Sequence, residues 1–203
     1  VATDDTKHFL TMESETYIQN CVISGPANPN KFTVFVDDTQ SGSITINSVQ
    51  FGSGWGGLSA QNTGTENINV IVQETTFAGE SDLTVPFKFS SQSTGMLFVI
   101  INNFAHLITN PFLNVDRYMD ISGPAVTAII SNTRINSTYG TINDALYVEN
   151  GSTILISSAG TTNPITSLHV ANVGAAPFIR ASSFISEAQT WDLLIEQPNT
   201  SGS

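Results

Sequence analysis

A short β-prone motif recurs seven times along this chain of 203 residues, and it constrains the fold more than any other feature. Each copy is a β-branched or aliphatic run that is closed by a small, usually polar residue. The copies begin 24 to 29 residues apart, at residues 17–20, 44–47, 70–73, 99–102, 128–131, 154–157 and 178–181. Strand-forming residues at a nearly constant period are the signature of a repeat architecture.

A second motif alternates strictly with the first. It reads apolar, variable, apolar, polar in most copies, and it occupies residues 34–37, 58–61, 87–90, 113–116, 146–149, 168–171 and 193–196, with steps of 22 to 33 residues. Each repeat therefore carries two strands joined by turns. The sequence predicts an all-β, single-domain solenoid of about seven coils over residues 17–197. Residues 1–16 are expected to cover the first coil, and residues 198–203 to form a tail.

The composition is acidic but poor in charge. Charged residues make up 11% of the chain, against roughly 25% in an ordinary soluble domain, and the net charge is −11 with only six Lys and Arg. This charge disfavours binding to nucleic acid or to anionic lipid. Abundant hydroxyl and amide side chains suit an extracellular or virion-surface β-protein. The single cysteine excludes an internal disulfide, and no cofactor is indicated.

Parallel strands in successive coils stack about 4.8 Å apart, so equivalent side chains are expected to form columns. The sequence predicts an interior aliphatic column, a polar column, and a set of Phe residues inside a second flat face. The aliphatic column is Ile46, Val72, Ile101, Ile130 and Ile156; the polar column is Asn20, Asn47, Gln73, Asn102, Ser131 and Ser157; the aromatic set is Phe51, Phe77, Phe104 and Phe184. Gln19 and Arg180 fall at the aliphatic position of the terminal copies, as capping coils would require.

This pattern of alternating short strands and amide ladders resembles the right-handed parallel β-helix of pectate-lyase-like proteins, over roughly residues 17–197. The resemblance implies the right-handed form of the fold. Members of that fold class include polysaccharide lyases and hydrolases, adhesins, phage tailspikes and other virion surface proteins. No catalytic motif of the family is found in this chain, so the resemblance does not select one of these functions.

The best catalytic candidates lie at the polar end of the second motif. Stacking of the 113–116 and 146–149 copies predicts that Asp116 and Glu149 lie on adjacent coils, with Arg117 beside the first. Two carboxylates about 5 Å apart suit a retaining glycosidase or one face of a calcium site. The alternative is a solvated polar edge. Tyr147 and His169 are expected to project from the opposite side of the strand.

Other candidates carry less chemistry. His8, His106 and His169 share no metal-ligand spacing and are interpreted as loop or edge residues, and no metal site is predicted. Trp55 lies in a glycine-rich turn, where it would contact a sugar or a partner, or else fold onto its own coil.

Two functions remain open from the sequence. The first is a non-enzymatic structural protein, such as a capsid-decorating or fibre protein of a virion, expected as a homotrimer in contact with capsid or tail proteins. The alternative is a carbohydrate-active β-helix, either a polysaccharide lyase or hydrolase that uses Asp116, Glu149 and Arg117, or a glycan-binding adhesin.

Overall fold

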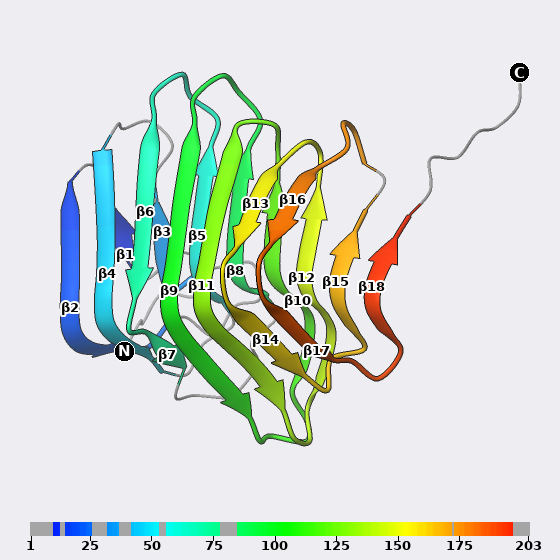
Figure 1. Ribbon diagram of the computed structural model, residues 1–203. Helices are drawn as coiled ribbons and strands as arrows, with labels where there is room; N and C mark the ends of the chain where they lie inside the picture. Colours follow the sequence, from blue (N-terminus) through cyan, green and yellow to red (C-terminus); the bar gives the residue numbers. More distant parts are fainter. Residues whose placement is uncertain are drawn as a thin grey trace, which may run out of the picture.

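A computed structural model describes residues 10–12, 15–25, 32–36, 42–52, 56–77, 85–171 and 173–196. Over these residues the chain forms a parallel β-solenoid, and no helix is present among them (Figure 1). The all-β solenoid predicted from the sequence is therefore confirmed. The strands that carry the first motif, β2 to β16, mark about six complete turns, one fewer than the expected seven coils.

One side of the solenoid is an eight-stranded parallel sheet built from the second motif. Its strands, in spatial order, are β1 (Leu10–Met12), β3 (Val34–Val36), β5 (Gly56–Asn62), β8 (Val85–Ser91), β10 (Asn114–Ser122), β12 (Thr141–Glu149), β15 (Thr166–Val170) and β18 (Trp191–Ile195). Strands of successive coils are direct neighbours, so each coil adds one strand to this sheet.

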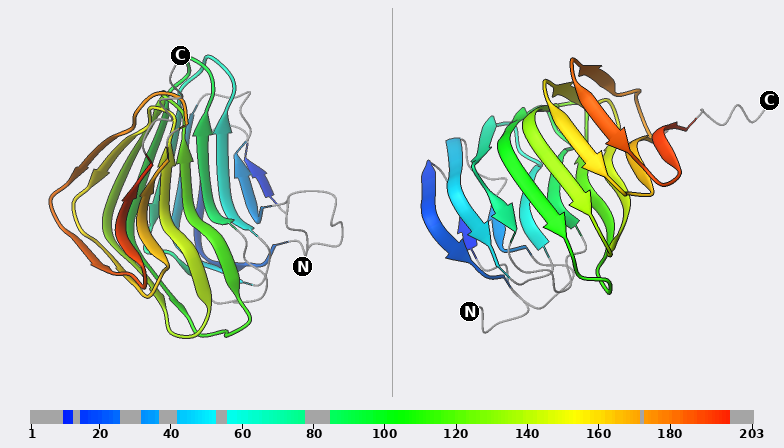
Figure 2. Two further views of the ribbon diagram at one scale, coloured as in Figure 1. Left: turned by 90° about the vertical axis from the view of Figure 1, so that its right-hand side faces the viewer. Right: turned by 60° about the horizontal axis from the view of Figure 1, so that its bottom comes forward.

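The first motif builds a ten-stranded sheet. Its main path runs through β2 (Thr16–Ile23), β4 (Gly42–Phe51), β6 (Ile68–Gln73), β9 (Leu97–Ile108), β11 (Val126–Ser137), β13 (Thr153–Ile156) and β16 (Phe178–Ala181). Two further strands, β7 (Thr76–Phe77) and β14 (Ala159–Thr162), pair with the later halves of the long strands, and β17 (Phe184–Glu187) pairs with β14. The long strands bend sharply, which gives each coil a third flat face (Figure 2).

A column of residues with positive φ makes this bend. Its members are Asn20, Ser48, Glu74, Asn103 and Asn132, with φ between 45° and 54°. Asn adopts the left-handed conformation more readily than most residues, which explains its place in three of the five coils. The preceding position is the predicted polar column from Asn47 to Ser131, and Ser131 Oγ donates a hydrogen bond to Asn102 Oδ1 at 3.0 Å.

The interior follows the predicted columns in the middle coils. Ile46, Val72, Ile101, Ile130 and Ile156 are in register and fully buried. The aromatic set is split between two columns. Phe51 stacks on Phe77 at a centroid distance of 5.0 Å, whereas Phe104 aligns through Thr133 and Ala159 with Phe184. Phe51 and Phe77 follow the polar column by four residues, but Phe104 follows it by two.

The terminal copies of the first motif are shifted by one residue from the expected register. Ile18 pairs with Ile46, and Ala181 pairs with Ile156, so Gln19 and Arg180 are not at the aliphatic position. Gln19 rather than Asn20 belongs to the polar column. The interpretation of Gln19 and Arg180 as capping substitutions is therefore wrong. Alternation along a strand decides which side chains face the core, and a slip of one residue reverses every one of them.

Candidate functional site

The expected pair of Asp116 and Glu149 does not form. On β10 and β12, Asp116 lies opposite Asn143, whose Nδ2 donates a hydrogen bond to Asp116 Oδ1 at 3.1 Å, and Glu149 lies opposite Ser122. Asp116 and Ser122 are six residues apart, about 20 Å along an extended strand. The fourth copy of the second motif is residues 119–122, because Met119 aligns with Phe87 and Leu146. Leu113 ends the preceding turn instead.

In this register Ser122 takes the place that the sequence assigned to Asp116, and the outward side chain that precedes it is that of Asp120. Asp120 lies on the outer face of the eight-stranded sheet, between Lys88 on β8 and Tyr147 on β12. Arg117 Nη1 lies 3.5 Å from Asp120 Oδ2, and the Arg117 guanidinium carbon stacks 3.4 Å from the centre of the Tyr147 ring. The Tyr147 hydroxyl donates a hydrogen bond to Glu149 Oε2 at 3.0 Å. Arg117 and Glu149 therefore meet through Tyr147.

Tyr147 and His169 lie on the same face as these charged groups, against expectation. Tyr147 and Glu149 are two residues apart on one strand, and such residues share a face of the sheet. The Tyr147 and His169 rings meet edge to face at 4.9 Å. His169 Nδ1 lies 3.0 Å from Asp144 Oδ2, and its Nε2 lies 3.1 Å from Glu196 Oε1. We call this group the Tyr147 cluster: Arg117, Asp120, Asp144, Tyr147, Glu149, His169 and Glu196.

Burial shifts the pKa of two groups in the Tyr147 cluster, Asp120 and Tyr147. Desolvation raises the pKa of Asp120 above its ordinary value, although the positive charges of Arg117 and Lys88 oppose the rise. Desolvation, together with the hydrogen bond to Glu149, raises the pKa of Tyr147 to about 12. Asp120 therefore holds a proton more readily than an exposed carboxyl group, and Tyr147 remains a hydrogen-bond donor at neutral pH.

The other candidates do not form a site. His106 is buried, not at an edge or in a loop, and its Nδ1 lies 2.7 Å from the hydroxyl of Tyr118 among the core aromatic rings. Trp55 and His8 lie outside the described residues. Among the residues that the structure describes, no group of three or more His, Cys, Asp or Glu side chains is arranged to hold a metal ion. Nor does the described part of the chain contain a helix able to cross a membrane.

Neighbouring strands thus create the Tyr147 cluster, and the sequence motif alone did not reveal it. The signal that was missed is the outward column of Lys88, Asp120, Tyr147 and His169, which appears once Met119 replaces Leu113 in the alignment of coils. In comparisons with known proteins, no family model, no curated protein and no solved structure matches this chain.

Proposed function

We propose that this chain is a non-enzymatic structural protein that is built into a larger assembly through the C-terminal end of its solenoid. We propose that the assembly is the surface of a virion, in which this chain would be a decoration protein or a fibre protein. The observation that carries the proposal is an interior that is left uncovered in the last coil.

The inner column of the eight-stranded sheet shows this directly. Leu58, Phe87 and Met119 are 0% exposed, but the exposed fraction rises to 8% at Leu168 and 51% at Leu193. Ile195 and Trp191, on the same last strand, are exposed by 59% and 52%. In the described part of the chain, β16 and β18 each pair on one side only. An apolar end with open strand edges favours association with another β-structure.

The Tyr147 cluster also fits a structural role. Each of its four carboxylates already has a partner within the cluster: Arg117 for Asp120, Tyr147 for Glu149, and His169 for both Asp144 and Glu196. The contacts of His169 join β12, β15 and the residue after β18, and the stacking of Arg117 on Tyr147 joins β10 to β12. Such cross-strand pairs each stabilise a sheet by roughly 0.2–1 kcal/mol, so the cluster ties the last coils together.

The solution mass of the chain tests the proposal. We expect light scattering to give an oligomer, with three copies as the state predicted from the sequence. The double variant Leu193→Lys/Ile195→Lys places two charges on the open end and is expected to be monomeric. Phe178→Ser, which removes an exposed apolar side chain from the outer face of the same coil, is the matched control and should leave the oligomer unchanged.

Circular dichroism of each variant shows whether the last coils remain folded. A parent chain that is monomeric at high concentration would remove the support for assembly through copies of itself. An oligomer that survives the double lysine substitution with its fold intact would place the interface elsewhere than the open end.

A second function is favoured by one observation, the proximity of Asp120, whose pKa is raised, to Arg117, Tyr147 and Glu149. We propose that, if the chain cleaves a polysaccharide, Asp120 supplies the proton and Glu149 is the second carboxylate. On a panel of plant and bacterial polysaccharides, Asp120→Asn is expected to lower the rate of cleavage by about 100-fold or more. Asp116→Asn, on the same strand, is the control and should retain the parent rate.

A further inference from the structure

A groove of about 500 Å³ lies on the outer side of the third face of the solenoid, away from the Tyr147 cluster. It spans the later halves of β9 and β11 together with β14 and β17. Its volume falls within the range of roughly 300–1,000 Å³ that is usual for sites of small ligands.

Two outward rows of side chains form the groove. The first row is Ala105, Arg134, Gly160 and Ile185, and the second is Asn136, Thr162 and Glu187. Two positions of the first row are small: Ala105 has only a methyl group and Gly160 has no side chain. The floor of the groove is low over these two residues, because neither has a long side chain that would fill the space there. Asn103 and Asn132, at the bend, border the groove on one side.

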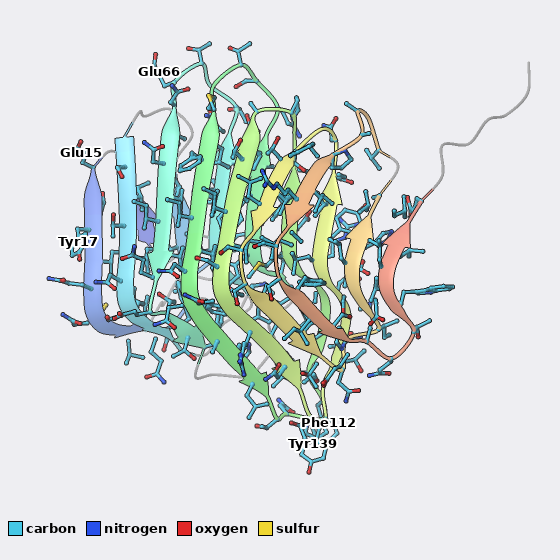
Figure 3. The ribbon with its side chains drawn as sticks, viewed as in Figure 1. Glu15, Tyr17, Glu66, Phe112 and Tyr139 are labelled. Atoms are coloured by element: carbon cyan, nitrogen blue, oxygen red, sulfur yellow. The ribbon has the colours of Figure 1, made fainter. Side chains whose placement is uncertain are left out.

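On the opposite side, the second row leads to a tip of exposed aromatic residues. Phe112 and Tyr139 are 92% and 70% exposed, and Figure 3 shows them together at the lower edge of the molecule. They lie in the turns that follow β9 and β11. These turns are stacked, because Thr138 N donates a hydrogen bond to Ile108 O at 2.8 Å and Thr141 N donates to Leu113 O at 2.9 Å. Tyr139 is three residues beyond Asn136, about 10 Å along the chain.

The chemistry of this surface is neutral and amphipathic. The side chains of Asn103, Asn132 and Asn136 each offer both a donor and an acceptor. The groove contains one cationic side chain, Arg134, and one carboxylate, Glu187, so its charges balance. Exposed aromatic rings beside such a groove offer flat apolar faces. A neutral oligosaccharide has matching groups, because its hydroxyls both donate and accept hydrogen bonds and its ring C–H faces are apolar.

We infer that this groove and the aromatic tip together form a binding site for a neutral oligosaccharide of a few sugar units. Hydroxyls of the sugar bond to the three Asn side chains and to Arg134, while one ring packs against Tyr139. No bond is broken in this process. The inference does not depend on the proposed assembly, since the groove lies on an outer face and the open end comprises interior positions of the last coil.

Titration of the ¹⁵N-labelled chain with neutral trisaccharides tests the inference. The panel comprises the trimers of N-acetylglucosamine, mannose and β-linked glucose, together with maltotriose. At least one is expected to give saturable shifts of amide signals, and these shifts should be confined to residues of β9, β11, β14, β17 and the two stacked turns.

The variant Gly160→Val fills the floor of the groove with little risk to the fold. A Cβ at this position would meet Ile185 O at 3.7 Å and Ile185 Cβ at 4.0 Å, which are ordinary contacts. We expect it to weaken binding at least about tenfold, and Tyr139→Ala to weaken binding about three- to tenfold. Thr127→Val, outward on the earlier half of β11, is the matched control and should bind as the parent does.

Two results would overturn the inference: absence of saturable shifts with every trisaccharide, or an affinity that Gly160→Val leaves unchanged in a folded chain. The Leu193→Lys/Ile195→Lys variant separates this inference from the proposed assembly. It should bind the trisaccharide as the parent does, even where it no longer forms an oligomer.

Discussion

At the scale of single residues, Asp120 combines two opposing effects. Its burial disfavours the charged form, and the positive charges of Arg117 and Lys88 favour it; burial outweighs them, so the pKa is raised from 3.8. A carboxyl group whose pKa is raised in the folded state stabilises the fold fully below the unfolded pKa. That contribution is lost as the pH rises through the folded pKa. At neutral pH, ionised Asp120 therefore costs stability.

Asp120→Asn removes this cost because the amide cannot ionise. We expect the variant to unfold at a higher temperature than the parent at pH 7, by up to a few degrees, and the difference to shrink as the pH falls through the raised folded-state pKa and to be lost below about 3.8. Thermal unfolding followed by circular dichroism between pH 3 and 8 measures this dependence. A variant that is less stable than the parent at pH 7 would show that the ion pair with Arg117 outweighs the cost of burying the charge.

The residues of the Tyr147 cluster also show where sequence reasoning ends. Glu149 and Arg117 were both selected from the sequence, and both belong to the cluster. Asp116 was chosen because Leu113 was aligned with Phe87; with Met119 in that place the closing position falls on Ser122, and Asp120 was missed because it lies at the variable position of the motif. Nothing in the local pattern distinguishes Leu113 from Met119, since both are apolar and precede a polar residue by three.

At the scale of elements, the sequence predicted the first-motif strands of the middle coils in their correct register, whereas the fourth copy of the second motif was placed six residues too early. Ile44, Val70, Val99, Ala128 and Ile154 pair as the first motif requires, because the interior aliphatic positions recur without insertion. The register was missed at both ends, where the motif contains apolar residues on both faces. Tyr17 and Phe178 are β-prone but exposed, and they were mistaken for interior residues.

The sequence predicted the polar column that lies next to the bend in the long strands, but it did not predict how the backbone makes this bend. The amide position next to the bend holds register by side-chain hydrogen bonds, and the following residue turns the chain through its positive φ. Asn serves both purposes, so adjacent polar residues in the sequence conceal two separate columns. Ser48 and Glu74 adopt the same backbone conformation with less intrinsic preference for it.

At the scale of the whole molecule, a solenoid is stabilised mainly by contacts between neighbouring coils. Its stability is therefore expected to vary along the stack, and the exposure of the last coil indicates where it is lowest. The C-terminal strands β16, β17 and β18 have a neighbour on one side only within the described residues, whereas β9 and β11 lie between coils on both sides. Opening is expected to begin at the C-terminal end.

Two alanine substitutions at interior positions measure this gradient. Ile130 is fully buried between Ile101 and Ile156, so Ile130→Ala is expected to cost about 2–5 kcal/mol and to speed hydrogen exchange in β9, β11 and β13. Leu193 is half exposed, so Leu193→Ala should cost less and affect exchange in β15 and β18 alone. Hydrogen exchange followed by mass spectrometry, at a concentration where the chain is monomeric, resolves these segments.

If both substitutions accelerated exchange equally along the whole chain, the solenoid would unfold as one cooperative unit and its open end would not be a separate, weaker element. If the last coil of the monomeric parent were instead the slowest to exchange, the exposed strand β18 would not be the weakest part of the stack, and the predicted gradient of stability would be wrong.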